Sequence, residues 1–323
     1  MELVTKKRLE FYAGRSHPAL AQDVADHLGI TQGTPNLRRF PNSEVHCQFR
    51  ESVRGSDVFI FQTHVPPVND SILEQCIMID AAKRASARRI TAVAPYLGYS
   101  RQDRKASGRE PISAKLVTDM LTAAGADRIV SVDLHSSQIQ GFFDGPVDHL
   151  TALPVLIGHL RALELEDPVV VAPDAGRIKV AERFSQYLGW DLAFVYKRRP
   201  KGQPEHVEAL DVIGNIAGRS CVLIDDIIDT AGTICAAADL LLERGASEVR
   251  AAATHAVLSD PAVDRLKNSS LARVALTDTL PVPEEKRFDA LEVLSVAGVI
   301  ADAIQAVFAD TSVSEIFGGD NQV

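Results

Sequence analysis

Cysteine is scarce in this chain, and its few thiols are not arranged for pairing. The 323 residues include four cysteines, Cys47, Cys76, Cys221 and Cys235, and none of them forms a CxxC pair. Structural zinc sites and redox-active disulfides depend on closely spaced cysteines. We therefore expect four separate thiols in a reducing compartment, buried as small apolar side chains.

Long apolar runs and a basic excess are also lacking. No stretch is long and apolar enough to span a bilayer, and the segment before Gly14 passes into a strand-like run without the apolar region of a signal peptide. The formal charge of -9 argues against a nucleic-acid partner, because binding to a phosphate backbone is driven by a basic surface. These absences favour a cytoplasmic globular protein that binds neither membrane nor nucleic acid.

Short apolar runs alternate with longer amphipathic stretches along the chain. The runs that predict strands are 58–61, 90–94, 129–132, 169–172, 192–196, 222–224 and 249–253. The stretches with helical spacing are 71–85, 113–123 and 234–243. This alternation predicts an α/β fold with mostly parallel sheets flanked by crossover helices. The length is that of two ordinary domains.

Two pairs of similar segments suggest a duplication. The glycine-to-histidine segments 125–135 and 245–255 have equal length, and the segment 55–61, before a predicted helix, resembles the segment 218–224. No Gly/Ser-rich linker interrupts the chain, so the halves should pack tightly. We predict a join near 150–165 and two domains, 8–155 and 156–317.

An acidic loop follows the predicted strand 222–224. It reads Asp225-Asp226-Ile227-Ile228-Asp229-Thr230-Ala231-Gly232-Thr233 and leads into a predicted helix. Ligands of open α/β sheets bind at such carboxyl ends of strands. The hydroxyl and N–H groups at the helix start suit a phosphate dianion. Asp225 and Asp226 suit the vicinal hydroxyl groups of a ribose, or a magnesium ion held with them.

The alternative interpretation of this loop is purely structural. Asp225 and Asp226 would then be a solvated strand end, and Asp229 would be the N-cap of the helix. Asp229 can also cap the helix and still belong to a site. Adjacent aspartates after a buried strand, followed by a Thr-x-Gly-Thr turn, are uncommon by chance, so we favour a ribose-phosphate site.

The acidic loop resembles the phosphoribosyl pyrophosphate signature of the type I phosphoribosyltransferase fold. Four more segments resemble those of class I ribose-phosphate pyrophosphokinases, also called phosphoribosyl pyrophosphate synthases: Arg101-Gln102-Asp103-Arg104-Lys105, Val132-Asp133-Leu134-His135, Gln138-Ile139-Gln140-Gly141-Phe142-Phe143-Asp144 and Lys197-Arg198-Arg199-Pro200. The resemblance runs from about Leu9 to Phe317. It implies two tandem duplicated phosphoribosyltransferase-like domains.

The resemblance also implies a reaction. The β,γ-pyrophosphoryl group of Mg-ATP would pass to the 1-hydroxyl of ribose 5-phosphate, giving AMP and a product used in purine, pyrimidine, NAD, histidine and tryptophan biosynthesis. Such a transfer mainly needs position and positive charge. Lys197 and Arg199, in a charged loop after the strand 192–196, are the implied catalytic pair. Without the resemblance, a solvated basic turn is the better interpretation.

The implied binding residues fall into three sets. Ribose 5-phosphate is expected at Asp225, Asp226, Asp229, Thr230, Ala231, Gly232 and Thr233. ATP is expected at Phe40, Asn42, Glu44, Arg101, Gln102, Arg104 and His135. One or two Mg²⁺ ions are expected at His135 and Asp174, with Asp133 nearby; an oxygen-rich site suits magnesium better than zinc.

Each of these assignments has a structural alternative. A lone histidine such as His135 is more often structural, and Arg101 and Arg104 alone would be a basic loop tip. In the family, the segment that matches Phe40 reaches the nucleotide of a neighbouring subunit, which implies that the least active unit is a dimer. In isolation, Phe40 would be interpreted as a core aromatic.

A regulatory site at subunit interfaces is a further implication. The matching residues are Ser52, Arg54, Gln140, Asp148, His149, Ser312 and Phe317, and they imply a homo-hexamer built from dimers, activated by inorganic phosphate and inhibited by ADP. Two positions depart from the family pattern. His149 replaces a common Asn, and Arg177 replaces a common Gly. The added cation either strengthens phosphate binding or marks a subgroup.

Three rival functions are weaker. A phosphoribosyltransferase that consumes the product would not need the segment 101–104 or a second domain copy. A non-catalytic regulatory subunit should carry substitutions at His135, Lys197, Arg199 or the acidic loop, and the sequence shows none there. A dinucleotide-dependent oxidoreductase would need GxGxxG after the first strand, which the sequence from Gly14 does not supply.

Overall fold

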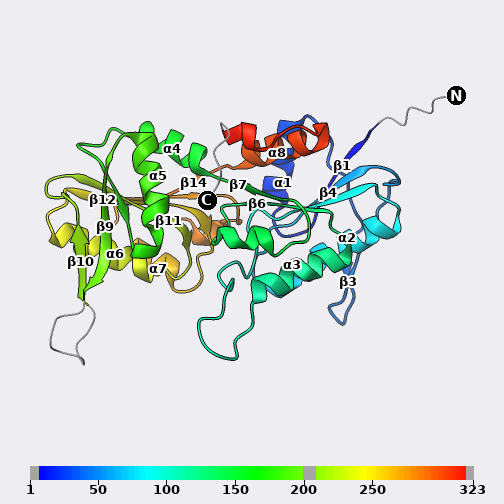
Figure 1. Ribbon diagram of the computed structural model, residues 1–323, viewed down its shortest axis with the longest axis horizontal. Helices are drawn as coiled ribbons and strands as arrows, with labels where there is room; N and C mark the ends of the chain where they lie inside the picture. The colour runs from blue at the N-terminus through cyan, green and yellow to red at the C-terminus, as the bar shows by residue number, and fades with distance from the viewer. Residues whose placement is uncertain (1–6, 199–208, 318–323) are drawn as a thin grey trace. The chain divides into compact units, whose positions relative to one another are not determined.

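The computed structural model describes residues 7–198 and 209–317, which divide into two compact units (Figure 1). The first unit contains the chain up to Thr151, the short segment Thr279–Pro281 and the chain from Val296. The second unit contains Ala152–Asp278 and Val282–Ser295. The predicted limits, 8–155 and 156–317, do not anticipate that the end of the chain returns to the first unit.

In the first unit, five of the described strands form a parallel sheet in the order β1-β4-β5-β6-β7. These strands are β1 (Leu9–Ala13), β4 (Asp57–Phe61), β5 (Arg89–Val93), β6 (Arg128–Val132) and β7 (Val147–Leu150). Every residue of β4 is buried, as expected for a parallel strand covered on both faces. A separate hairpin pairs β2 (Arg38–Arg39) with β3 (Val45–His46).

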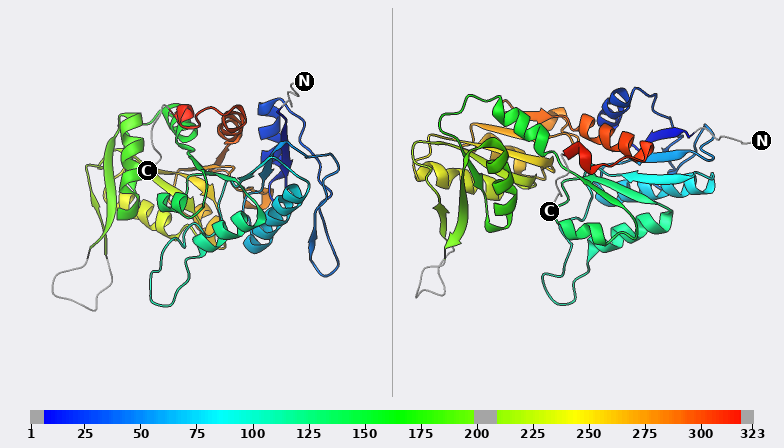
Figure 2. Two further views of the ribbon diagram at one scale, coloured as in Figure 1. Left: turned by 45° about the vertical axis from the view of Figure 1, so that its right-hand side comes forward. Right: turned by 45° about the horizontal axis from the view of Figure 1, so that its top comes forward.

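Helices cover both faces of this sheet (Figures 1 and 2). On one side lie α1 (Pro18–Leu28) and α8 (Ala297–Ala309), and on the other lie α2 (Val68–Arg84) and α3 (Ser113–Ala124). The 3-10 helices of this unit are η1 (Ser137–Gly141) and η4 (Ser314–Phe317). The C-terminal helix α8 buries Ile300, Ile304 and Val307 and packs against α1. This apolar contact explains why the end of the chain belongs to the first unit.

In the second unit, seven of the described strands form a sheet in the order β10-β9-β8-β11-β12-β13-β14. These are β8 (Val169–Ala172), β9 (Asp191–Arg198), β10 (Ala209–Ile213), β11 (Ser220–Ile228), β12 (Glu248–Ala256), β13 (Arg273–Thr277) and β14 (Leu291–Leu294). All neighbours are parallel except β9 and β10. The helices are α4 (Leu153–Arg161), η2 (Ala175–Arg177), α5 (Ile178–Leu188), α6 (Gly232–Glu243), α7 (Ala262–Lys267) and η3 (Glu284–Lys286). The predicted α/β class, with two mainly parallel sheets flanked by helices, is confirmed.

The two sheets share a strand order. The run β8-β11-β12-β13-β14 in the second sheet repeats the order of β1-β4-β5-β6-β7, and in each run a helix leads from the second strand to the third. The resembling segments 55–61 and 218–224 fall on the corresponding strands β4 and β11. The equal intervals 125–135 and 245–255 do not mark corresponding strands, because they contain β6 and β12. Both begin at a glycine with positive φ, at Gly125 and Gly245, where a helix gives way to a strand.

The expectation of separate thiols is also confirmed. The four cysteines of the described chain are free, with Cys76 and Cys221 buried and Cys47 and Cys235 half-buried. Burial raises the pKa of the thiols of Cys47, Cys76 and Cys221 to about 11, which makes them poor nucleophiles at neutral pH. Within the described residues, no helix is long and apolar enough to cross a membrane.

Candidate functional site

The acidic pair Asp225 and Asp226 lies inside strand β11, which runs on to Ile228. The prediction that the strand stops at Ile224 is therefore wrong. The reason is in the pairing: β11 pairs with β8 only as far as Leu223, but it stays paired with β12 through Ile228. One edge of β11 thus stays paired with β12, whereas the other edge is open beyond Leu223 because β8 ends at Ala172. The acidic pair lies at this opening, and Asp226 is only 7% exposed.

Arg177 provides the counter-charge for this pair. Its Nε atom lies 3.1 Å from Oδ1 of Asp225, and its Nη2 atom lies 3.0 Å from Oδ1 of Asp226. The backbone N–H of Asp226 also donates to Oδ1 of Asp225, at 2.8 Å. Burial raises the pKa of Asp225 to about 8, with a further rise from the hydrogen bond and charge of Asp226, while Arg177 opposes the shift.

The turn after β11 opens helix α6. Ala231 is the N-cap residue, in the left-handed region at φ 61°, and Gly232 is the first helical residue. The structural alternative that Asp229 is the N-cap is therefore wrong. Ala231 has no side-chain oxygen to satisfy the first amides of α6, and Thr230, Gly232 and Thr233 are exposed around them. This helix start can accept a phosphate.

Arg265, in helix α7, contacts the same turn. Its Nη1 atom donates to the carbonyl oxygen of Thr230 at 2.9 Å, and a Cβ atom added to Gly232 would lie 3.4 Å from that nitrogen. A guanidinium group therefore lies beside the start of α6. The sequence analysis missed Arg265, because it lies in a separate helix outside any quoted motif and only the packing of α7 against α6 brings it to the loop.

The predicted catalytic pair is only partly described. Lys197 lies within β9, opposite Leu210 of β10, so its backbone belongs to a strand and not to the loop after one. Its side chain is not described. Arg199 lies outside the described residues. The catalytic assignment of both residues stays a prediction.

Asp174 follows strand β8 in the second unit. Its Oδ1 atom accepts a hydrogen bond from the Gly176 N–H at 2.8 Å, which caps the 3-10 helix η2 that carries Arg177. The residue is exposed. A carboxylate in this position is accessible to a cation from solvent and at the same time fixes the path of the chain towards Arg177.

The predicted ATP residues belong to the first unit. Arg101, Gln102 and Arg104 are exposed and lie between β5 and α3. Gln102 anchors this loop, because its Oε1 atom accepts from the Ser113 hydroxyl at 2.7 Å and its carbonyl accepts from the Ala114 N–H at 3.2 Å. The start of α3 thus holds the middle of the loop, and the two arginines on either side of Gln102 extend from an anchored base.

The second predicted ATP segment is the β2–β3 hairpin. The Phe40 N–H donates to the Glu44 carbonyl at 2.9 Å, and the Glu44 N–H donates to Oδ1 of Asn42 at 3.2 Å. Phe40 is 40% exposed, and Arg38 lies over its ring at 5.3 Å from the centroid. The interpretation of Phe40 as a core aromatic is wrong, because the hairpin carries it out of the core.

His135 follows strand β6 and is half-buried. The residues before it are fixed: Oδ1 of Asp133 accepts from the Thr151 hydroxyl at 2.7 Å, and the Leu134 N–H donates to Nε2 of His149 at 2.8 Å. Among the residues that the structure describes, no three His, Cys, Asp or Glu side chains gather closely enough to hold a metal ion by themselves.

The predicted regulatory residues all lie in the first unit. Gln140 and His149 are neighbours, with Nε2 and Nδ1 atoms 3.5 Å apart, and the adjacent Asp148 pairs with Arg128 at 2.5 Å. The carbonyls of Ser52 and Arg54 accept from Arg8, and the hydroxyl of Ser312 lies 2.8 Å from that of Ser314. Phe317 ends η4. The structure therefore brings Gln140, Asp148 and His149 together and leaves the other residues on separate segments.

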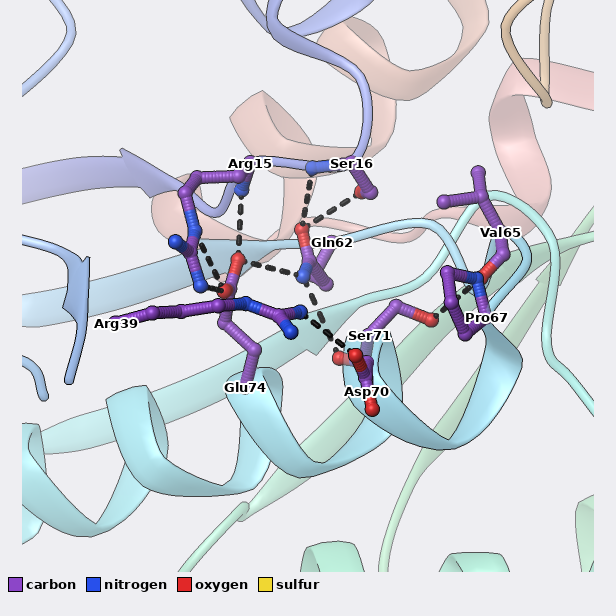
Figure 3. Close-up of a pocket in the computed structure, with 9 residues that line it drawn as sticks. All are labelled: Arg15, Ser16, Arg39, Gln62, Val65, Pro67, Asp70, Ser71 and Glu74. Carbon is purple, nitrogen blue, oxygen red and sulfur yellow. Dashed lines mark hydrogen bonds and ion pairs between the residues drawn. The ribbon is translucent and has the colours of Figure 1, made fainter. Parts of the chain in front are cut away.

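A cavity in the first unit was not foreseen from the sequence (Figure 3). It is lined by Arg15, Ser16, Arg39, Gln62, Val65, Pro67, Asp70, Ser71 and Glu74. Arg15 pairs with the buried Glu74, and Arg39 pairs with Asp70 at 2.7 Å. Each charge is thus balanced within the cavity, so its electrostatics favour neither an anion nor a cation.

Comparison with known proteins gives consistent similarities. Residues 9–125 match the family model described as the N-terminal domain of ribose phosphate pyrophosphokinase, and residues 191–318 match the phosphoribosyl synthetase-associated domain. The chain is 57% identical to the ribose-phosphate pyrophosphokinase of Bifidobacterium longum over 315 residues, covering 96% of this chain and 93% of that protein. It is 52% identical to the ribose-phosphate pyrophosphokinase of Streptomyces avermitilis over 313 residues, covering 97% of each.

A solved structure is similar over nearly the same length. The crystal structure of phosphoribosylpyrophosphate synthetase from Mycobacterium smegmatis superposes with a TM-score of 0.88 at 51% identity, covering 94% of this chain and 99% of that one. The similarity therefore includes both units and both sheets.

Proposed function

This chain belongs to the ribose-phosphate pyrophosphokinase family, and from that membership and its geometry we propose which residues carry out the reaction. The enzyme makes phosphoribosyl pyrophosphate from ribose 5-phosphate and ATP. The ribose 1-oxygen forms a bond to the β-phosphorus of ATP. The bond from that phosphorus to the α,β-bridging oxygen breaks, the bridging oxygen leaves on AMP, and the proton of the 1-hydroxyl passes to solvent.

The single observation that carries the assignment of the sugar site is that two largely buried carboxyl groups precede an exposed helix start on the same segment. Asp225 and Asp226 can accept hydrogen bonds from vicinal hydroxyl groups, and the first amides of α6, with Thr230 and Thr233 beside them, can bind a phosphate dianion. Ribose 5-phosphate carries both groups in one molecule. We therefore assign it to the loop from Asp225 to Thr233.

ATP is assigned to exposed groups of the first unit. The guanidinium groups of Arg101 and Arg104 suit the phosphate oxygens, and Gln102 holds their loop to α3. Phe40, with Asn42 and Glu44, would stack on the adenine or bond the ribose of ATP bound to a neighbouring subunit. An exposed aromatic on a hairpin is suited to such a role, and its burial would then require a second copy of the chain.

The family is generally magnesium-dependent, and the exposed carboxylate of Asp174 is chemically suited to that ion. Magnesium is typically held by one or two carboxylates, several waters and the phosphate oxygens of its substrate, so it does not require a complete cage of side chains. Asp174 would supply an exposed carboxylate, and His135 would supply an imidazole. When bound, the ion would neutralise charge on the phosphate groups of ATP.

Lys197 and Arg199 would stabilise the negative charge on the transferred pyrophosphoryl group. We expect Lys197→Ala to lower kcat by about 100-fold or more, as for the loss of one group that binds transition-state charge, with little change in the unfolding midpoint. Lys179→Ala, on the surface of α5, is the matched control. An equal loss of kcat in both variants would remove Lys197 from the reaction.

The assembly and its control are proposed from the family pattern. A class I enzyme would form a hexamer built from dimers in the cytoplasm, with inorganic phosphate as activator and ADP as inhibitor at Ser52, Arg54, Gln140, Asp148, His149, Ser312 and Phe317. Here His149 accepts a hydrogen bond from the Leu134 N–H, next to His135. This contact would link the regulatory segment to an ATP residue. Sedimentation and a phosphate titration of the rate test these proposals.

The overall reaction is tested by product analysis. Purified protein, Mg-ATP and ribose 5-phosphate should give equal amounts of AMP and phosphoribosyl pyrophosphate. Release of ADP would mean that only the γ-phosphoryl group is transferred, and the proposed attack on the β-phosphorus would then be wrong. Omission of magnesium should stop product formation.

A further inference from the structure

Arg177 has an unusual place in the fold. It is the N-cap residue of α5, where a positive side chain opposes the positive end of the helix dipole. The stability of α5 therefore does not account for an arginine here. The path of the chain accounts for it: η2 follows β8, the strand beside β11, and places Arg177 at the edge of β11 that is open beyond the end of β8.

The geometry of Arg177 matches the acidic pair and not a phosphate. Two nitrogen atoms of one planar guanidinium group reach one carboxylate each, at 3.1 Å for Asp225 and 3.0 Å for Asp226. Both carboxylates present their Oδ1 atoms to it. Its side chain is 17% exposed, so this bridge is largely shielded from solvent.

We propose that Arg177 is a positioning residue for the sugar, bridging Asp225 and Asp226 so that the two carboxylates are held in the arrangement that accepts the vicinal ribose hydroxyl groups. Two adjacent, largely buried carboxyl groups repel each other when both are ionised, and the shared guanidinium group gives their Oδ1 atoms one planar hydrogen-bond donor that fixes both orientations. This inference rests on the proposed sugar site. It makes Arg177 a determinant of ribose recognition rather than a phosphate ligand.

The proposal predicts that substitution of Arg177 weakens the binding of the sugar but not that of ATP. Arg177→Gln should raise the KM for ribose 5-phosphate by about tenfold or more, because the charged hydrogen bonds that fix the pair are lost, while kcat and the KM for ATP stay within about threefold. The preference for ribose 5-phosphate over 2-deoxyribose 5-phosphate should fall as well, since the carboxylates contact the hydroxyl groups. Arg177→Lys, which keeps the charge but not the planar fork, should restore part of both effects.

The experiment measures initial rates with both sugars for the full-length enzyme and these two variants. Lys179→Gln, two residues along the chain, is the control for loss of a positive charge and should leave both KM values unchanged. If Arg177→Gln raised the KM for the two sugars by the same factor, Arg177 would act on the phosphate and the proposal would be overturned. An unchanged KM for ribose 5-phosphate would also overturn it.

The doubly substituted Asp225→Asn, Asp226→Asn variant separates this inference from the proposed function. If that variant loses ribose 5-phosphate while Arg177→Gln does not, the sugar site stands and the role of Arg177 is wrong. If the double variant binds ribose 5-phosphate normally, the sugar site itself is wrong, and the role of Arg177 is overturned with it. Calorimetric titration of ribose 5-phosphate makes this distinction even where turnover is too slow to measure.

Discussion

The proposed sugar segment of the second unit and the proposed ATP segments of the first unit present polar groups in opposite ways. Asp225 and Asp226 lie within a buried strand and share one arginine. Phe40 and Arg104 lie exposed, on a short hairpin and a loop. The strand order of the second sheet positions the two aspartates, whereas local turns position Phe40 and Arg104.

This difference has an energetic reason. An isolated buried charge costs several kcal/mol, so carboxylates in a buried strand need a partner such as Arg177 in the folded protein. The proposed sugar site would therefore be formed before its ligand binds. Exposed side chains carry no such requirement, and they lose side-chain entropy when they bind. We expect the sugar site to be preorganised and the ATP site to be completed by its ligand.

The strongest test of this difference is to remove the two carboxyl groups of the proposed sugar site. Asp225→Asn with Asp226→Asn should weaken ribose 5-phosphate binding by about 100-fold or more, because two carboxyl acceptors for the ribose hydroxyl groups are lost and the positive charge of Arg177 loses its two acidic partners. ATP affinity should change by less than about threefold. Calorimetry measures both, with the exposed Asp264→Asn as control. Unchanged sugar binding would contradict the assignment.

The sequence predicted much of this region, for a reason visible in the structure. A parallel strand that is buried on both faces must be apolar, so 222–224 stood out, and the change to aspartate marked the carboxyl edge of the sheet. The strand's true end at Ile228 was not predictable from composition. It depends on the pairing of β11 with β12 beyond the point where β8 ends, which is a contact between distant segments.

Other features were missed for the same reason. The return of α8 to the first unit depends on its packing against α1, and the contact of Arg265 with Thr230 depends on where α7 lies. Without the family resemblance, Phe40 would be interpreted as a core aromatic, but the short hairpin carries it to the surface. Local patterns identified the elements, whereas long-range packing decided which side chains meet.

The second prediction tests the exposed arginines of the proposed ATP site. Arg101→Ala with Arg104→Ala should raise the KM for ATP by about tenfold or more through lost phosphate contacts, with ribose 5-phosphate affinity nearly unchanged. The midpoint of thermal unfolding should stay constant, because both side chains are exposed. Lys105→Ala, beside them, is the control. A lowered midpoint would show that these arginines support the fold.

The third prediction separates the two ends of the sugar. Arg265→Gln should raise the KM for ribose 5-phosphate by about three- to tenfold, because the turn at Thr230 loses its anchor and the helix start loses a nearby cation. The preference over 2-deoxyribose 5-phosphate should stay constant, in contrast to Arg177→Gln. Lys267→Gln, in the same helix, is the control. A loss of selectivity would show that Arg265 also affects the carboxylates.

The last prediction concerns the pH dependence of stability without ligands. The pKa of Asp225 is raised from 3.8 to about 8, mainly by burial, so the folded state holds this proton more tightly than the unfolded chain. The resulting stabilisation is fully present below about pH 4 and is lost as the pH rises through about 8. Arg177 limits the loss, because its charge favours the ionised carboxylate.

Asp225→Asn removes the titrating carboxyl group, so the stability of the variant should fall less as the pH rises. Urea unfolding followed by a probe in the second unit, at about pH 5 and about pH 9, should show a larger drop of the midpoint for the natural protein than for the variant. Arg177→Lys should keep most of the natural behaviour, since the positive charge remains. If the midpoints of the natural protein and of Asp225→Asn fell equally with pH, Asp225 would be ionised throughout, and the raised pKa would be wrong.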